Sequence, residues 1–555
     1  MTVFVALETA LVATCVLVAL CGAQAETSLL QRPEFSEAPS AEEPQGPQPY
    51  VIGLRRESVP IYRRGKIASF KTSYSGVLSV GSPSQHFRVV FDTGSGNIVL
   101  PAKECSSEAC LVEGRRRFDM RASSTGVAIN ADGSIPTGGL TDRVTIGFGT
   151  GEITGEFAKD IVCFGTASAQ ELASADVAGA GSGAENATSV VFNETQTRTP
   201  DDAANVTEKD LCVEMDVVLA VEMSNQPFKT FQFDGILGLG LGSLALNKNF
   251  SAFDMLLGRG LPSGSFGVFL TEGEEGEESE IAFGGVDTRR MLEPALSWAP
   301  VMMPEHGHWM VQILAIRIGG KELDLCKDGT CRGVVDTGTS HLGIPAPADV
   351  EVGQLLTADA GDVFDCRLVD APEVEIVLPG KTLTLQPHNY MRRLPLREGV
   401  SVSSSNGVHM PAQDGSKPAA AGAAPAAATG QAAADPEARR FCRPRVMPVR
   451  LPAPLGPKLF ILGEPVLHRY YTVYDWVNQR VGFSLANSRR NTMDPQELVD
   501  RKGALPKEVD VLLMQQSLKV SKAPVGAEAQ EPEETATVFM QVELKVSVRR
   551  RSRKA

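Results

Sequence analysis

The chain has 555 residues, of which 43% are apolar, and this is enough sequence for two or three domain-sized cores. Its formal net charge of −14 argues against a nucleic-acid-binding surface. The one strong basic run, RRRSRK at residues 549–554, is interpreted as a solvated tail.

The first 25 residues have the pattern of a secretory signal peptide. An apolar run at 10–22, ALVATCVLVALCG, is followed by AQA, a small-x-small sequence ending at Ala25. The run is short for a membrane span, although the absence of a basic start and the presence of Glu8 leave an uncleaved signal anchor open. We expect the secretory pathway, with a secreted protein or an acidic vacuole or lysosome-like compartment as destinations.

Two contrasting segments follow the signal. Residues 26–48 are rich in Pro, Glu and Ser and are typical of disorder. Residues 50–66, YVIGLRRESVPIYRRGK, are basic. Their two Arg pairs are either processing sites or a basic plug against an acidic body.

From Phe70 onward the sequence predicts a mainly β protein. Short apolar or alternating runs such as YSGVLSVG, HFRVVFD and RVTIGFGTG are separated by Gly, Pro, Ser and Asn. Residues 251–260 are one short helical candidate. Low-complexity insertions are expected at 166–210 and 401–438. The extension at 487–555 loses the β pattern and is expected to be largely disordered, with TVFMQVELKVSV either a strand or an amphipathic piece.

The cysteines and glycosylation signals agree with a secreted protein. Cys15 and Cys21 lie in the signal, which leaves an even number of eight from a total of ten. Zinc binding is the rival interpretation, but no histidine pairs occur at finger spacing. The nearest pairs predict four disulfides, although sequence does not fix connectivity: Cys105–Cys110, Cys326–Cys331, Cys366–Cys442 and, with the weakest basis, Cys163–Cys212. N-x-S/T acceptors occur at Asn186, Asn193, Asn205 and Asn249.

One unusual feature occurs twice. Residues 89–101 read VVFDTGSGNIVLP and residues 333–345 read GVVDTGTSHLGIP, so an aspartate twice ends an apolar run and enters a small-residue turn. Each copy is followed by an apolar-Leu-Gly triplet, at residues 236–238 and 461–463. The same motif order in each half predicts two related lobes.

With these motifs the chain resembles the pepsin-like aspartic endopeptidases over residues 74–486, apart from the insertions. The resemblance implies two β-rich lobes, at 67–285 and 286–486, with a central cleft and a β-hairpin flap. It also implies a propeptide at about 26–66, whose basic segment would lie across the acidic cleft and loosen in acid.

The same resemblance assigns the site. Asp92 and Asp336 would be catalytic and close enough to share one proton, because two adjacent carboxylates cannot both ionise cheaply. Water would attack the peptide bond directly, without a metal or any other cofactor. The supporting residues would bond the carboxylates or cross-link the two loops: Thr93, Gly94, Ser95, Thr337, Gly338 and Thr339.

The flap sequence GFGTGEITG departs from the family pattern. Phe148 replaces the usual tyrosine, and Val99 replaces the tryptophan that normally bonds it. Because both partners are missing together, no polar group is stranded, and we expect a more apolar and more mobile flap. Substrate contacts are expected from Phe148, Gly149 and Thr150 on one side and from Gly338, Thr339 and Ser340 on the other.

The sequence therefore predicts an aspartic endopeptidase made as a zymogen, active in acid on extended polypeptides. The alternatives are a catalytically silent relative that binds peptides or proteins, and a lectin-like or adhesive β protein. The second alternative leaves the paired Asp-Thr-Gly unexplained. We expect polypeptide substrates, a monomer, no nucleic acid and no stable membrane span in the mature chain unless the signal is retained.

Overall fold

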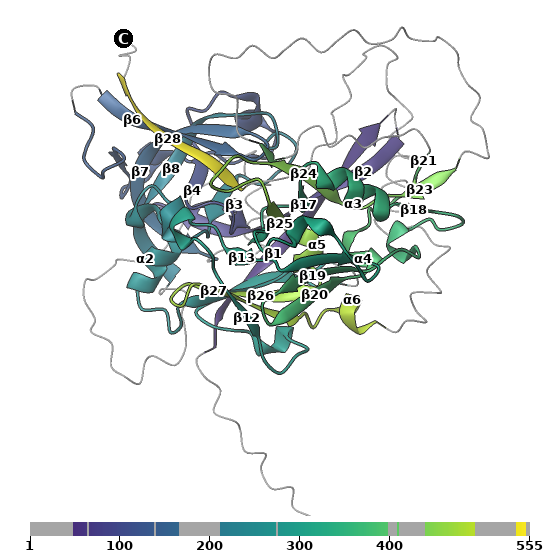
Figure 1. Cartoon of the computed structure of the whole chain (residues 1–555). Coiled ribbons are helices and arrows are strands. Elements are labelled where there is room, and N and C mark those ends of the chain that lie inside the picture. Colours follow the sequence, from purple (N-terminus) through teal and green to yellow (C-terminus); the bar gives the residue numbers. More distant parts are fainter. Residues whose placement is uncertain are drawn as a thin grey trace, which may run out of the picture. The chain divides into compact units, whose positions relative to one another are not determined.

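The computed structural model describes residues 48–63, 66–137, 140–165, 211–272, 276–397, 408–409, 439–493 and 540–550. Figure 1 draws the remaining residues as a thin grey trace. The predicted signal peptide, the insertion at 166–210, most of the insertion at 401–438 and the acceptors Asn186, Asn193 and Asn205 lie outside the described residues. Within the described residues, no helix has both the length and the apolar character that crossing a membrane requires.

The prediction of a mainly β protein is confirmed. The strands of the first half are β1 (Tyr50–Arg63), β2 (Lys66–Val80), β3 (Gln85–Asp92), β4 (Ile98–Pro101), β5 (Val127–Ile129), β6 (Leu140–Phe148), β7 (Glu152–Phe164), β8 (Cys212–Met223), β9 (Gly235–Gly238), β10 (Ser265–Phe269) and β11 (Ser279–Phe283). The helices are α2 (Ala252–Gly258), α3 (Ala348–Leu355), α4 (Pro387–Tyr390), α5 (Glu464–Leu467) and α6 (Arg489–Thr492). Helix α2 falls inside the predicted helical candidate at 251–260.

The second half is also built from strands. They are β12 (Ser297–Pro300), β13 (Met310–Gln312), β14 (Ala315–Ile318), β15 (Lys321–Glu322), β16 (Arg332–Val335), β17 (Leu342–Pro345), β18 (Ala358–Asp359), β19 (Val374–Leu378), β20 (Lys381–Leu385), β21 (Leu396–Arg397), β22 (Val408–His409), β23 (Arg440–Cys442), β24 (Val446–Arg450), β25 (Leu459–Leu462), β26 (Tyr470–Asp475), β27 (Arg480–Leu485) and β28 (Gln541–Arg550).

The sequence pattern of each strand matches its environment. In β7 buried and exposed positions alternate, with Ile153 and Phe157 inward and Glu156 outward, as expected for a strand with one solvated face. In β9, by contrast, all four residues are buried, and its sequence is the continuous run GILG. A strand covered on both faces has no outward position for a polar side chain.

The sheet order contains the internal repeat that the motifs predicted. In the first half the strands run β3-β9-β4-β8, and in the second half they run β16-β25-β17-β24. In both sets the first pair is parallel, the second antiparallel and the third parallel. The same four-strand unit therefore occurs twice, and each copy leads its first strand into an Asp-Thr-Gly turn.

The glycines of the two triplets let the strands of each unit approach closely. A Cβ on Gly238 would lie 2.5 Å from the backbone nitrogen of Asn97, and one on Gly463 would lie 2.3 Å from the carbonyl oxygen of Thr339. Both distances are far below van der Waals contact, so only glycine fits. The triplets thus press β9 and β25 against the loops that carry the aspartates.

The basic segment predicted to lie across the cleft is a strand of the sheet. β1 pairs with β11 and then with β2, and Ile52 and Leu54 are buried in the main core. Its Arg56 interacts electrostatically with Glu464 and Glu272. The pKa of each of these carboxyls lies well below its ordinary value, so mild acid leaves both charged. Mild acid therefore does not release Arg56 by protonating Glu464 or Glu272.

The last described part of the C-terminal extension is ordered as a strand. Residues 541–550 form β28, which pairs antiparallel with β6 along the whole of that strand. Figure 1 shows β28 in yellow beside β6. The alternating run VELKVSV suits an edge strand with one face on the protein, and the open choice between strand and amphipathic piece is resolved as a strand.

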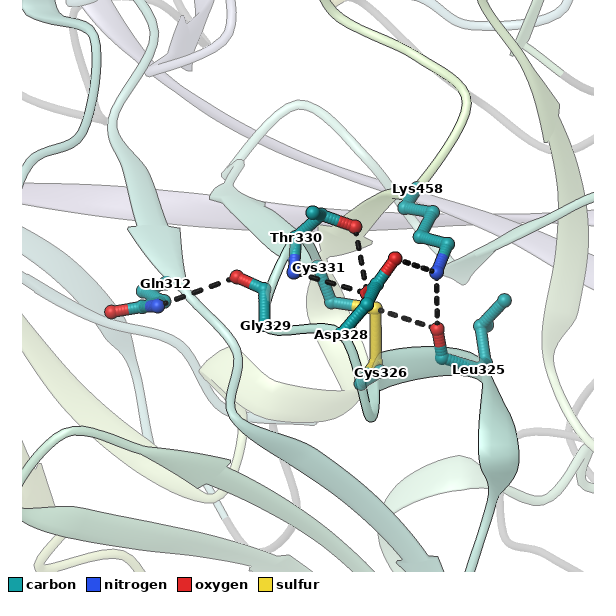
Figure 2. Close-up of a disulfide and its surroundings, with 8 residues drawn as sticks. All are labelled: Gln312, Leu325, Cys326, Asp328, Gly329, Thr330, Cys331 and Lys458. Carbon is teal, nitrogen blue, oxygen red and sulfur yellow. Dashed lines mark hydrogen bonds and ion pairs between the residues drawn. A yellow bond between two sulfur atoms is a disulfide. The ribbon is translucent and has the colours of Figure 1, made fainter.

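The structure contains the four expected disulfides: Cys105–Cys110, Cys163–Cys212, Cys326–Cys331 and Cys366–Cys442. Figure 2 shows the third, whose loop is also held by Lys458. The Lys458 Nζ donates to the Leu325 carbonyl oxygen at 2.8 Å and to Asp328 Oδ2 at 2.7 Å. Strand β16 starts directly after Cys331, so this anchored loop fixes the beginning of the strand that leads to Asp336.

A buried ionic cluster joins the two halves beside the aspartate loops. Glu464 on α5 accepts hydrogen bonds from the hydroxyls of Thr72 at 2.5 Å and Tyr74 at 3.1 Å, both from β2. From the second half, Arg445 NH1 donates to it at 3.0 Å. Burial alone would raise the pKa of Glu464, but Arg445 and then His468 outweigh it and hold that pKa far below its ordinary value.

Replacing Glu464→Gln should lower the free energy of unfolding by roughly 3–5 kcal/mol, because it leaves Arg445 buried without its counter-charge. The control Glu322→Gln breaks an exposed ion pair with Arg317 and should change stability by at most about 1 kcal/mol. Since the folded pKa of Glu464 lies below the unfolded one, its contribution is present above the unfolded pKa and is lost only as pH falls toward the folded pKa. Denaturant unfolding at neutral and mildly acidic pH measures the stability of both variants. Equal losses of stability in Glu464→Gln and Glu322→Gln would contradict the prediction.

Candidate active site

The two repeated units bring Asp92 and Asp336 together. Asp92 is the last residue of β3, Asp336 directly follows β16, and both side chains are completely buried. The loops touch: a Cβ on Gly94 would lie 2.8 Å from Asp336 Oδ1. Each carboxyl also changes the proton affinity of the other. Sequence reasoning placed this pair 244 residues apart in one site, and the geometry brings them into contact.

Each carboxyl is held by the same two donors from its own turn. The backbone N–H of Gly94 donates to Asp92 Oδ1 at 2.9 Å, and the hydroxyl of Ser95 donates to Oδ2 at 2.5 Å. In the second turn the equivalent distances are 2.8 Å from Gly338 N–H and 2.5 Å from the Thr339 hydroxyl. Asp92 and Asp336 are therefore oriented by matching sets of hydrogen bonds.

Thr93 and Thr337 cross-link the loops underneath. The N–H of Thr93 donates to the hydroxyl oxygen of Thr337 at 3.0 Å, and the N–H of Thr337 donates to the hydroxyl oxygen of Thr93 at 3.0 Å. The Thr93 hydroxyl donates to the Val335 carbonyl at 2.9 Å, and the Thr337 hydroxyl donates to the Phe91 carbonyl at 2.6 Å. Each hydroxyl therefore bonds the strand of the other half, which fixes the spacing of the two aspartates.

Burial makes it costly for both carboxyls to be charged. It raises the pKa of Asp92 well above its ordinary value, and the neighbouring Asp336 raises it further, against the hydrogen bonds from Ser95 and Gly94. Burial also raises the pKa of Asp336, although Thr339 and Gly338 oppose that shift. The pair therefore retains a proton to a higher pH than an isolated carboxyl, and the proton belongs to the pair.

The segment predicted to be the flap is a hairpin formed by β6 and β7. Phe148 N–H donates to the Gly151 carbonyl at 2.7 Å across its tip. The Phe148 ring is 2% exposed and makes an edge contact with Phe228, with ring centres 5.8 Å apart. Val99 is buried in the same apolar cluster. The environment of Phe148 is thus apolar, while the mobility of the flap stays a prediction.

The remaining predicted contact residues, Gly149, Thr150 and Ser340, differ in their burial and hydrogen bonding. Thr150 is half-buried at the flap tip, and Gly149 N–H donates to the Met540 carbonyl at 3.1 Å. Ser340 is buried, with its hydroxyl 2.9 Å from Nδ1 of His341. Gly149 is therefore already engaged by the C-terminal segment.

Sequence reasoning missed two aromatic residues beneath the site. Trp309 is fully buried and donates from Nε1 to the Leu239 carbonyl at 2.8 Å, next to the first triplet. Tyr474 is also fully buried, interacts with Thr93, and stacks on Phe266 with ring centres 4.8 Å apart. No motif marks either residue, because Trp309, just before β13, and Tyr474, in β26, both lie outside the two Asp-Thr-Gly motifs.

This fold and this pair of cross-linked Asp-Thr-Gly turns define a pepsin-like protein. A model of the eukaryotic aspartyl protease family matches residues 73–189 and 201–404, and the chain belongs to that family. The chain is 26% identical to gastricsin of Homo sapiens over 429 residues, covering 76% of this chain and 83% of gastricsin. It is 27% identical to cathepsin E of Rattus norvegicus over 421 residues, covering 74% and 80%.

The variant Phe148→Tyr should not raise kcat/KM, because its hydroxyl would enter an apolar cluster that offers no replacement for the missing tryptophan. It should lower stability by about 1–3 kcal/mol, the cost of a buried polar group without a partner. The double variant with Val99→Trp supplies that partner, and its kcat/KM should exceed that of Phe148→Tyr. Peptide-cleavage kinetics and thermal unfolding measure these effects.

Phe157→Tyr is the matched control, since Phe157 lies in the same cluster further along β7. It should lower stability similarly without changing kcat/KM. A strong gain in kcat/KM from Phe148→Tyr alone would show that Phe148 and Val99 are not coupled.

Proposed function

We propose that the protein is an aspartic endopeptidase that hydrolyses peptide bonds in extended polypeptides. The observation that carries this proposal is the pair of buried, neighbouring carboxyls of Asp92 and Asp336, each held by a hydroxyl and a backbone N–H. A silent binding protein has no need for two costly buried carboxyls with complete supports. The family membership reported above supports the same class of activity.

The mechanism follows from one proton shared by the two carboxyls. The ionised member accepts a proton from water, and the water oxygen attacks the carbonyl carbon of the scissile bond. The protonated member donates to the carbonyl oxygen as the tetrahedral intermediate forms. Collapse of the intermediate breaks the C–N bond: the leaving nitrogen takes up a proton from one carboxyl, and a hydroxyl of the intermediate returns its proton to the other carboxyl as the new carboxyl group of the product forms. All protons are accounted for by Asp92, Asp336 and the consumed water.

The substrate would be a peptide in extended conformation. The flap tip offers the N–H of Gly149, and the first turn offers the carbonyl of Gly94, so a main chain between them can be held as an added strand. Gly338 and Thr339 would approach it from the second turn. Large apolar clusters on both sides favour substrates with bulky apolar side chains near the cleaved bond.

The proposed location is the secretory pathway, since the disulfides fit an oxidising compartment. We propose a precursor from which residues 1–25 and then about 26–66 are removed, with the two lobes ending near residues 285 and 486. Because β1 lies between β2 and β11, its removal must be followed by a rearrangement of the sheet. Of the proposed glycosylation sites, Asn249 is exposed.

Replacing Asp92→Asn should lower kcat by about 10²–10⁴-fold or more, because it removes one half of the acid–base pair. Asp370→Asn, at an exposed position, is the control and should leave kcat unchanged. Peptide-library cleavage in mild acid, with and without a statine-type inhibitor, measures both. Equal cleavage by Asp92→Asn and wild type, or no cleavage by wild type, would overturn the proposed function.

The pH dependence should follow the shared proton. The raised pKa of Asp92 means that the pair keeps one proton in mild acid and loses it as pH rises through that pKa. We expect kcat/KM to be highest in acid and to fall toward neutral pH, after N-terminal sequencing has established which form of the chain is assayed. A flat profile from acid to neutral pH would contradict the shared proton.

A further inference from the structure

The C-terminal strand β28 begins inside the candidate active site. The N–H of Gln541 donates to the Gly94 carbonyl at 2.8 Å, and the N–H of Gly149 donates to the Met540 carbonyl at 3.1 Å. Gly94 lies two residues after Asp92, and Gly149 lies at the flap tip. The main chain at 540–541 is therefore held between the catalytic turn and the flap.

Side chains anchor the same two residues. Met540 is 0% exposed and packs in an apolar cluster of the second half. Gln541 is also buried, and its Nε2 donates to the Leu244 carbonyl at 3.1 Å. Burial of the large apolar Met540 side chain, together with the hydrogen bond from Gln541 Nε2, makes this end of the segment a specific contact. The cluster that receives Met540 includes Met310, Val334, Met447, Leu459 and Ile461.

The rest of the strand covers the outer edge of the flap. Leu544 packs against the apolar cluster that contains Phe148, and β28 is paired with β6 as far as Arg550. Toward its end the strand is less buried, since Val546 is 47% exposed and Val548 is 68% exposed. A strand anchored at one end and exposed at the other, on a sheet edge, can separate from that edge and pair again.

An extended substrate would need the same groups. It would bond the Gly94 carbonyl and the Gly149 N–H, which Gln541 and Met540 already use, and it would place a side chain where Met540 lies. A cavity of about 240 Å³ lies beside the segment, between residues 541–544 and residues 451–455.

We propose that residues 540–548 are an intramolecular ligand of the cleft that competes with the substrate. This inference rests on the proposed function, because it assigns the regulation of that same site. When the segment is bound the cleft is closed to substrate, and the apparent affinity is reduced by the fraction of molecules in that state. The segment thus acts from the opposite end of the chain to the basic segment expected to serve as the propeptide.

The test is Met540→Asn in the full chain, compared with wild type and with the matched control Val548→Asn. A polar amide in the Met540 cluster should weaken the segment, so KM should fall by roughly tenfold or more with kcat unchanged. The Kd of a statine-containing peptide, measured by calorimetry, should fall by the same factor, and the amide of Gly149 should exchange faster with deuterium. Val548→Asn should match wild type in all three.

The outcomes separate this inference from the proposed function. If no variant cleaves peptides but Met540→Asn still lowers the Kd and exposes the Gly149 amide, the competing segment stands and the peptidase proposal fails. If wild type cleaves peptides and Met540→Asn leaves KM, Kd and exchange unchanged, the segment does not compete. Faster exchange without any change in KM or Kd would also overturn it.

Discussion

The structure depends on the close approach of two buried carboxyls, those of Asp92 and Asp336. Burial makes each charge expensive, and proximity makes a second charge more so. Matching donors stabilise both carboxyls: a hydroxyl and a backbone N–H donate to Asp92, and the same two types of group donate to Asp336. The reciprocal hydrogen bonds between Thr93 and Thr337 then fix the spacing of the two Asp-Thr-Gly turns. A small displacement of either turn would change the proton affinity of both carboxyls.

The surrounding architecture can be understood as support for that contact. Two four-strand units of the same pairing order deliver the aspartates. Two glycines let the neighbouring strands press against the turns, and the Glu464 cluster ties β2 of the first half to α5 of the second. Because the pKa of Glu464 lies far below its ordinary value, this tie stays charged in the mild acid where the dyad keeps its proton. Burial thus raises the pKa values of Asp92 and Asp336, whereas cationic neighbours lower the pKa of Glu464.

Local sequence predicted the parts of the fold and site that repeat or that depend on short motifs. The mainly β class, the helix inside 251–260 and the two Asp-Thr-Gly turns follow from patterns a few residues long, whereas the roles of the supporting hydroxyls follow from the family resemblance. Trp309 and Tyr474 could not be predicted, because long-range packing alone brings them under the turns. The place of the basic segment was not predicted either: burial of Ile52 and Leu54 in the core outweighs the attraction of its arginines to a cleft.

The pairing of the C-terminal strand also could not be predicted from local sequence. Its alternating sequence allowed a strand, but its partner, the outer edge of the flap, is some 400 residues away along the chain (541 − 148 = 393). The strand gives the site an occupant that neither the motifs nor the family resemblance predicted.

Neutron diffraction of crystals grown in mild acid can locate the proton that Asp92 and Asp336 are proposed to share. Nuclear density should show one hydrogen between the carboxyls of Asp92 and Asp336, with Ser95 and Thr339 donating to the outer oxygens. Two hydrogens on the pair, or none, would contradict this account of the active site.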